Sequence, residues 1–339
     1  MGLIEEIREQ STVVARAIEH NHDTARLVAS LVGQCTHAVI AARGTSENAG
    51  RYAQYVWGTR NRISVGLTTP SLFSIYDRPP LLTDALVVGI SQSGQSPDIV
   101  SVLAEGRSQS RPTVAITNDP ESPLAKVADV IVNLVAGEER SVAATKTYSA
   151  TLAMVALISD AIDPDGPSLR ELASSVTGVL ELEGEVEKAA HAFADIEHCA
   201  VLGRGFNHAT AFEWALKLQE LTQVVAQPFS TADFLHGPVA VVEPGYPVLA
   251  VTVRGPVHDE VSEVLGRAAE AGARLLTISN DPTLTGLGGH QITIPGDLDE
   301  WISPVPAIVA AQLFAYHLTL AKGLDPEQPR GLKKVTRTT

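Results

Sequence analysis

Two short segments decide the fold of this chain, because each of them occurs twice. Thr113–Pro120 reads TVAITNDP and Leu275–Pro282 reads LLTISNDP, 162 positions further on. Ala38–Thr45 reads AVIAARGT and Ala200–Asn207 reads AVLGRGFN, at almost the same separation. Two matches at one offset indicate an internal duplication. The chain therefore predicts two homologous halves of about 160 residues each.

Within each half, short apolar runs alternate with longer stretches rich in Ala, Leu and Glu. This rhythm predicts parallel strands that are buried on both faces and connected by helices. The fold class is therefore α/β, with two tandem doubly wound, three-layer α/β/α domains whose sheets are mostly parallel. We expect ten strands, at His37–Ala42, Arg62–Thr68, Ala85–Ile90, Thr113–Thr117, Val130–Leu134, Ala200–Gly203, Val224–Phe229, Val248–Val253, Arg274–Ser279 and Gln291–Pro295.

Turn signals divide the chain. Asp163–Pro167 reads DPDGP, a dense cluster of turn residues, and marks the boundary between the halves. A long helical stretch, Ser168–Ala194, leads into the second half. We expect a helical lead-in at residues 1–31, a first domain at 32–165, a second domain at 166–322 and a C-terminal tail at 323–339.

The tail is basic in a chain whose formal net charge is -14, because it carries Arg330, Lys333, Lys334 and Arg337. A solvated chain end explains such a cluster, and so does a cationic strap over an anionic substrate. The acidic chain as a whole predicts no nucleic-acid partner and no membrane partner, since both surfaces attract Lys and Arg. No apolar run approaches the ~20 residues that span a bilayer.

Cysteine and histidine usage predicts the compartment and the cofactors. Cys35 and Cys199 lack metal-ligand spacing and fit a reduced, cytoplasmic protein. No cluster of His, Asp and Glu has convincing ligand spacing, so we expect no metal. We also expect that the protein works without a cofactor.

Two loops of the first half have the composition of a phosphate site. Arg43–Asn48 (RGTSEN) follows the first expected strand, and Ser91–Asp98 (SQSGQSPD) follows the third. Ligands bind beyond the carboxyl ends of such strands, and glycines and free amides at helix starts suit anions. Ser96 is expected to cap a helix that begins at Pro97. The candidate binding residues are Gly44, Thr45, Ser46, Ser91, Gln92, Ser93 and Ser96.

The absence of two known motifs from these loops indicates which class of phosphate compound they bind. Neither loop is a Walker A motif or a GxGxxG motif, which favours a sugar phosphate over a nucleotide. One serine-rich loop would be explained as an ordinary helix cap. Two loops on neighbouring strands favour phosphate binding, and the equivalent places of the second half, Arg204–Asn207 and Arg254–Val257, have lost the serines.

The second half carries a different cluster. Glu213, Lys217 and Glu220 share one face of a helix in AFEWALKLQELTQ. A solvated ladder of charges is the ordinary explanation. The neighbours are apolar nearly all round, which favours a partly desolvated carboxylate whose pKa is raised toward that of a working base. Further on, His236 lies between an apolar pair and Gly-Pro, although a single histidine is more often structural than catalytic.

The motifs GTS, SQSG, ATKT, ALKLQE, HGP and QPRGLKK occur in this order. This pattern resembles the double sugar-isomerase (SIS) domain family over nearly the whole chain, from about residue 10 to the end. The pattern is most similar to the isomerase half of glucosamine-6-phosphate synthases. It is also similar to stand-alone relatives, which include glucosamine-6-phosphate deaminases and fructosamine-6-phosphate deglycases.

The resemblance implies a role for each matching residue. Glu220 matches the base that moves a proton between C1 and C2 of the sugar. His236 matches a histidine that helps to open the sugar ring and reaches over from the neighbouring subunit, which implies a homodimer. Lys334 matches a tail lysine near the sugar carbonyl that can form a Schiff base. The phosphate contacts would come from the serines and Gln92 named above, and supporting contacts from Ala143, Glu213 and Lys217.

Some positions depart from the synthase pattern. Gly2 follows Met1 where a synthase carries its glutaminase cysteine, so no glutaminase is expected in this chain. Ala144 stands in place of a serine, Leu235 in place of a lysine and Arg43 in place of a cysteine. These forms are more similar to the stand-alone members.

The sequence therefore predicts a cytoplasmic enzyme that converts glucosamine 6-phosphate, a hexosamine 6-phosphate, to fructose 6-phosphate and ammonia. A fructosamine-6-phosphate deglycase is the first alternative. The isomerase subunit of a split glutamine–fructose-6-phosphate aminotransferase is the second. A phosphosugar sensor without activity is disfavoured, because Glu220, His236 and Lys334 are all present.

Overall fold

The structure is a computed structural model that describes residues 2–164 and 168–334. Contacts divide the chain into two compact units. The first-sheet unit comprises Thr12–Glu139, Lys146–Leu169 and Lys333–Thr339, and the second-sheet unit comprises Met1–Ser11, Arg140–Thr145 and Arg170–Leu332. Residues 165–167 of the expected boundary turn and Arg337 of the basic tail lie outside the described residues.

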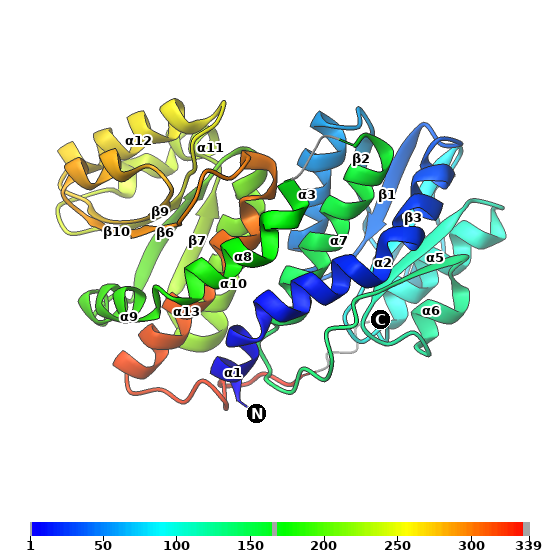
Figure 1. The fold of residues 1–339 in the computed structure, drawn as a ribbon, viewed down its shortest axis with the longest axis horizontal. Helices are drawn as coiled ribbons and strands as arrows, with labels where there is room; N and C mark the ends of the chain where they lie inside the picture. The colour runs from blue at the N-terminus through cyan, green and yellow to red at the C-terminus, as the bar shows by residue number, and fades with distance from the viewer. Residues whose placement is uncertain (1, 165–167, 335–339) are drawn as a thin grey trace. The chain divides into compact units, whose positions relative to one another are not determined.

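The first sheet has five parallel strands in the order β2-β1-β3-β4-β5, and Figure 1 labels β2, β1 and β3 of this sheet. The central strand β3 is buried at every residue, as a parallel strand covered on both faces must be. The strands are β1 (His37–Ala41), β2 (Ser64–Leu67), β3 (Ala85–Ile90), β4 (Thr113–Thr117) and β5 (Val130–Asn133).

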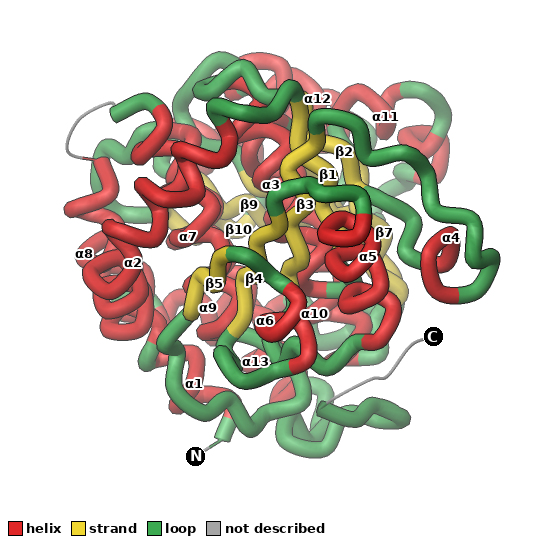
Figure 2. Tube along the Cα trace, turned by 90° about the vertical axis from the view of Figure 1, so that its right-hand side faces the viewer, coloured by secondary structure: helices red, strands yellow, loops and turns green. Residues whose placement is uncertain are grey.

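Helices cover both faces of this sheet, and Figure 2 shows α2 and α7 on one side of it and α5 and α6 on the other. On the α7 side, the indole of Trp57 on α3 donates a hydrogen bond of 3.1 Å to the carbonyl of Val155. On the other side, Leu103 and Leu124 pack with Val87 in one apolar cluster. The helices are α2 (Gln10–Val32), α3 (Thr45–Thr59), α4 (Ser71–Ser74), α5 (Pro97–Ser108), α6 (Pro123–Val127) and α7 (Lys146–Ile162).

The second sheet repeats the first. Its order, β10-β9-β8-β6-β7, is the same arrangement once β6 to β10 are matched with β1 to β5, and all pairs are parallel. The duplication and the α/β fold class are thus confirmed, and all ten expected strands are present to within a few residues. The strands are β6 (His198–Gly203), β7 (Val225–Phe229), β8 (Pro247–Val251), β9 (Arg274–Ser279) and β10 (His290–Thr293).

The second sheet is also covered by helices on both faces. On one face α13 packs against α9 and α10, where the rings of Trp214 and Phe314 meet edge to face with centroids 5.6 Å apart. On the other face Phe234 and Leu265 belong to one apolar cluster with Val248. The α-helices are α1 (Leu3–Arg8), α8 (Ser168–Leu180), α9 (Glu183–Ala192), α10 (His208–Thr222), α11 (Thr231–Leu235), α12 (His258–Glu270) and α13 (Pro304–Ala321).

Short 3-10 turns complete the unit, at η1 (Gly205–Asn207), η2 (Pro238–Val241), η3 (Pro282–Leu287) and η4 (Glu300–Ile302). The single helical stretch expected at Ser168–Ala194 is divided into α8 and α9 by a turn at residues 181 and 182. Helix α13 has the length and mean hydropathy (1.3) of a membrane-spanning helix. It is nevertheless 83% buried within the structure, as the central helix of a packed core is.

Candidate active site

The two serine loops of the first half lie at one edge of the first sheet. Ala41 at the end of β1 is paired with Gly89 near the end of β3, so the loops that follow start side by side. Gly44 precedes α3 with a φ of +52°, a conformation that side-chain-bearing residues rarely adopt. A Cβ placed on Gly44 would meet nothing within 4 Å, so the space beside this glycine is open.

The second loop is built around its own hydroxyls. The Oγ of Ser91 accepts a hydrogen bond of 3.1 Å from the amide of Gly94, and the Oγ of Ser93 accepts one of 3.3 Å from Gln95. Gly94, with a φ of +60°, lies so close to Ser122 that a Cβ there would be 2.1 Å from its Oγ. This loop therefore requires glycine at that position.

Ser96 precedes α5 and Pro97 is its first residue, as expected, but the hydroxyl of Ser96 makes no capping hydrogen bond. The side chains of Ser46 and Gln92 likewise have no hydrogen-bond partner among the residues that the structure describes. All three are half-buried beside the loops. These polar groups are thus available to a ligand at this edge.

An ion pair that the sequence did not reveal joins the two loops. The Nε of Arg43, in the loop after β1, lies 3.0 Å from Oδ2 of Asp98, in the first turn of α5. The carboxylate of Asp98 is fully buried, and its other oxygen accepts a hydrogen bond of 2.9 Å from the amide of Ile99. The ion pair of Arg43 therefore links the two loops.

The three charged residues on α10 do come together. The ammonium of Lys217 lies 3.3 Å from Oε1 of Glu213 and donates a hydrogen bond to Oε2 of Glu220. Lys217 and Glu213 are buried, whereas the Glu220 side chain is 21% exposed. Burial alone would lower the pKa of Lys217, but the two carboxylates outweigh it and raise that pKa above its ordinary value. The cluster is therefore a buried ammonium ion with one solvent-facing carboxylate, not a solvated ladder.

His236 makes no described contact with this cluster. It follows α11, a short helix capped by the Oγ of Ser230, which accepts a hydrogen bond of 3.1 Å from the amide of Asp233. The His236 ring is exposed and has no partner among the described residues. Gly237, with a φ of +139°, turns the chain directly after it.

Lys334 has a partner that sequence reasoning missed. Its ammonium lies 2.9 Å from Oε2 of Glu139, whose side chain is fully buried. The hydroxyl and the amide of Thr147 donate to the same carboxylate, at 2.7 and 3.1 Å. Thr147 thereby orients Glu139, and Glu139 fixes the end of the lysine side chain. No sequence signal distinguishes Glu139, because its partner lies 195 positions away.

Ala143 belongs to a segment that a second buried carboxylate holds. Oε1 and Oε2 of Glu6 accept hydrogen bonds from the amides of Arg140 and Ser141, at 2.5 and 3.2 Å. Ala143 itself is 2% exposed. Glu6, in the N-terminal helix α1, was not a candidate either, because its role depends on residues 134 and 135 positions away.

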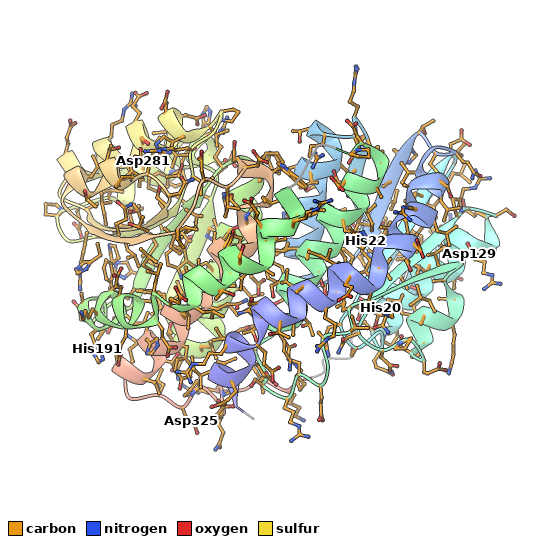
Figure 3. The ribbon with its side chains drawn as sticks, viewed as in Figure 1. His20, His22, Asp129, His191, Asp281 and Asp325 are labelled. Atoms are coloured by element: carbon orange, nitrogen blue, oxygen red, sulfur yellow. The ribbon has the colours of Figure 1, made fainter. Side chains whose placement is uncertain are left out.

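Other titratable groups do not form a metal site. In residues 2–164 and 168–334 no group of three or more His, Cys, Asp or Glu is arranged to hold a metal ion. His20 and His22 are exposed on α2 (Figure 3). Cys199 is buried, which raises the pKa of its thiol to about 12, and both cysteines are free.

The fold and these groups define a class: tandem α/β domains with a serine- and glycine-rich edge on one sheet and a buried ammonium–carboxylate cluster on a helix beside the other. The chain belongs to the SIS domain family, whose model matches residues 31–159 and 192–322.

Sequence similarity to individual curated proteins is consistent with this family. Glutamine–fructose-6-phosphate aminotransferase [isomerizing] of Synechocystis is 33% identical over 370 aligned residues, which cover 98% of this chain and 58% of that protein. The chain therefore spans little more than half the length of this curated relative.

Solved structures agree as well. The C-terminal domain of glucosamine-fructose-6-phosphate aminotransferase from Francisella tularensis superposes with a TM-score of 0.87 at 27% identity, covering 96% of this chain and 98% of that one. The glucosamine-6-phosphate deaminase of Thermotoga maritima gives a TM-score of 0.83 over 99% of both chains. At 20% identity, this second likeness shows the fold alone.

Proposed function

We propose that the protein is a cofactor-free phosphosugar aldose–ketose isomerase that converts glucosamine 6-phosphate and water to fructose 6-phosphate and ammonia. The observation that carries the proposal is the cluster on α10. A lysine buried between two carboxylates contributes little to stability, because desolvating the charges offsets their attraction. Such a cluster, with Glu220 facing solvent, is typical of a site that moves protons.

The first step is binding of the phosphate. We assign it to the loops after β1 and β3, where Gly44 leaves open space and Ser46, Gln92 and Ser96 have unused polar groups. A helix start supplies amides and a partial positive charge to a dianion. The ion pair between Arg43 and Asp98 keeps the two loops at a fixed spacing.

The second step is proton transfer on the open-chain sugar, after ring opening that we assign to His236. Glu220 removes the proton from C2 and returns it to C1, which converts the C1 aldehyde and C2 amine into a C1 alcohol and a C2 imine. Water adds to the imine, and ammonia leaves. The cations Lys217 and Lys334 suit the stabilisation of negative charge that develops on the sugar oxygen.

A second candidate is synthesis in the opposite sense, with ammonia supplied by a separate glutaminase. The observation that favours it is the likeness to glutamine–fructose-6-phosphate aminotransferases, over little more than half their length. A fructosamine-6-phosphate deglycase would use the same phosphate site and the same base but release an amino acid.

A panel of substrates tests the proposal. Glucosamine 6-phosphate, a fructosamine 6-phosphate carrying an amino acid, and fructose 6-phosphate with ammonium are each incubated with the protein, and ammonia, amino acid and hexosamine are measured. We expect ammonia from glucosamine 6-phosphate and none from glucosamine. Amino-acid release alone would favour the deglycase, and binding without turnover of any substrate would contradict an enzyme.

A further inference from the structure

The second sheet shares part of the glycine framework of the proposed phosphate loops, although Gly255, unlike Gly94, does not have a positive φ. Gly205 follows β6 as Gly44 follows β1, and both have a positive φ, of +60° and +52°. The loop between β8 and α12 has the same length as the loop between β3 and α5 and carries Gly255 where the other carries Gly94. The serines are absent, but the glycine framework and the helix starts are present.

A carboxylate lies in this second framework. A Cβ placed on Gly205 would be 3.0 Å from Oε1 of Glu300, and one placed on Gly255 would be 2.3 Å from Oε2. One carboxylate therefore contacts both glycines. Beside Gly44, in contrast, the corresponding space is empty to 4 Å.

Glu300 is unusual for a surface acid. Its side chain belongs to a residue that is only 9% exposed, and no described residue forms a hydrogen bond or an ion pair with its carboxylate. Burial raises its pKa, and His258 partly opposes this rise. Burial of a carboxylate without a salt bridge or a hydrogen bond is costly.

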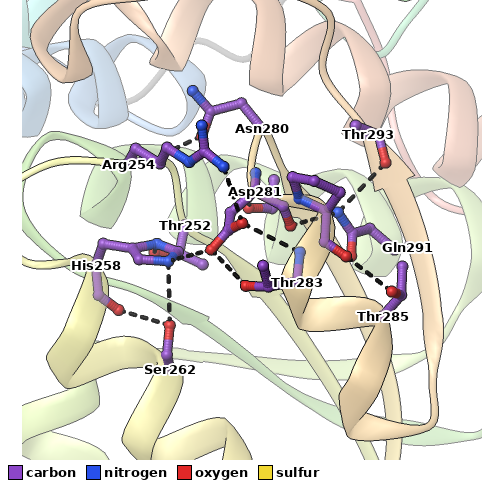
Figure 4. A network of polar contacts seen from close by, with 12 residues as sticks. Thr252, Arg254, His258, Ser262, Asn280, Asp281, Thr283, Thr285, Gln291 and Thr293 are labelled. Atoms are coloured by element: carbon purple, nitrogen blue, oxygen red, sulfur yellow. Dashed lines mark hydrogen bonds and ion pairs between the residues drawn. The ribbon is translucent and has the colours of Figure 1, made fainter. Parts of the chain in front are cut away.

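The described cations at this edge pair with other carboxylates, so an ion pair does not explain the position of the Glu300 carboxylate. Arg204 lies 2.8 Å from Glu260 in the first turn of α12. Arg254 and His258 both contact Asp281, at 3.3 and 2.9 Å, as Figure 4 shows. No side chain caps the start of α12, which directly follows the loop that carries Gly255.

We infer that the carboxylate of Glu300 occupies, in the second-sheet unit, the position that phosphate takes in the first-sheet unit, and so confines phosphosugar binding to the first sheet. The inference rests on the phosphate site proposed above. Glu300 lies four residues before α13, and the residue at the corresponding place before α7 is Val142, which carries no charge. Removal of the Glu300 carboxylate would expose a second site for an oxyanion such as inorganic phosphate.

Hydrogen–deuterium exchange with and without inorganic phosphate tests this inference. In the wild-type protein we expect phosphate to slow amide exchange at residues 43–48 and 91–98 only. In Glu300→Ala, and in Glu300→Ser as a second variant, phosphate should also slow exchange at residues 204–208 and 254–260. At several times its dissociation constant, the slowing should be roughly fivefold or more.

Glu260→Ala is the matched control, because it removes a neighbouring carboxylate and frees Arg204 but leaves Glu300 in place. It should gain no protection at the second edge. Equal protection in Glu260→Ala, no gain in either Glu300 variant, or phosphate protection of the second edge in the wild-type protein would each overturn the inference. If phosphate protects residues 204–208 and 254–260 in the Glu300 variants but protects residues 43–48 and 91–98 in no protein, the proposed function fails while the role of Glu300 stands.

Discussion

The two sheets have the same strand order but different carboxyl edges. The first edge carries serines and an open glycine, and an ion pair between Arg43 and Asp98 joins its two loops. The second edge carries arginines that are paired with carboxylates, and Glu300 fills the space against Gly205. A duplicated fold thus provides two equivalent edges, and side chains decide which of them stays open to a ligand.

The second edge also has a buried acid, Asp281, that makes more hydrogen bonds and ion pairs than its counterpart at the first edge. Asp281 accepts hydrogen bonds from the amide and hydroxyl of Thr283 and contacts Arg254 and His258 (Figure 4). Its counterpart by sequence, Asp119, accepts only the amide of Glu121 among the described contacts of its carboxylate. At the second edge the Asp281 carboxylate therefore links the loop after β9 to the loop after β8 and to the start of α12.

The largest expected effect is on kcat and follows from loss of the proposed base on α10. Glu220→Gln keeps the size of the side chain but removes the proposed base, and loss of a general base costs roughly 10²–10⁴-fold in kcat. Steady-state kinetics with glucosamine 6-phosphate measure it. Glu263→Gln, which alters an exposed ion pair with Arg267, is the control and should keep wild-type activity. Equal activity of the two variants would contradict the role of Glu220.

The next effect concerns the tail. Lys334→Met removes the ammonium that Glu139 holds, and loss of one electrostatic stabiliser in an active site costs roughly 10²-fold in kcat. Lys322→Met is the control, because the hydrogen bonds described for that lysine go to the carbonyls of Ala194 and Ile196. Full activity of Lys334→Met would show that the tail lysine is not part of the reaction.

A smaller effect, on the KM, is expected at the first edge, where the loops after β1 and β3 lie. Ser93→Ala removes one donor to a phosphate dianion, which weakens binding by roughly 1.5–3 kcal/mol. The KM should rise while kcat changes little. Ser262→Ala, at the second edge beside His258, should leave the KM unchanged. An unchanged KM in Ser93→Ala and Ser46→Ala would remove the phosphate site from the first edge.

The smallest effect is on stability and depends on pH. Hydrogen bonds from the Thr283 amide and hydroxyl, together with His258 and Arg254, hold the pKa of Asp281 well below its ordinary value. This carboxylate therefore stabilises the fold above the unfolded pKa of about 3.9, and the contribution is lost as the pH falls below it.

Asp281→Asn should lower the free energy of unfolding by roughly 1–2 kcal/mol at pH 7, and the difference from wild type should shrink between about pH 4 and pH 2. Urea denaturation at several pH values measures both quantities. Asp195→Asn, in an exposed pair with Arg274, should change stability by less than about 0.5 kcal/mol. A pH-independent difference for Asp281→Asn would contradict the assigned cause.

Local patterns were sufficient to predict much of the fold. Apolar periodicity located the strands, and the repeat of TNDP and SNDP located the duplication, because both signals lie within short segments. The expectation that no apolar run approaches a membrane span was less accurate. Helix α13 is 18 residues long and apolar on all sides, since it is buried between α9, α10 and the sheet.

Contacts between distant positions could not be predicted. Arg43 and Asp98 are 55 positions apart, and Lys334 and Glu139 are 195 apart, so neither pair leaves a periodic signal. Glu300 was not a candidate from the sequence, and only the structure places its carboxylate against Gly205 and Gly255. In each case the contact depends on which distant segments become neighbours in the folded chain.

The most direct test of the division between the two sheets is solvent-deuterium exchange at C2 of a hexose 6-phosphate, measured at saturating substrate in two variants. The account predicts that Glu220→Gln binds the sugar phosphate but shows no exchange at C2, whereas Ser93→Ala, once saturated, exchanges at close to the wild-type rate. Wild-type exchange in Glu220→Gln, or loss of exchange in saturated Ser93→Ala, would contradict it.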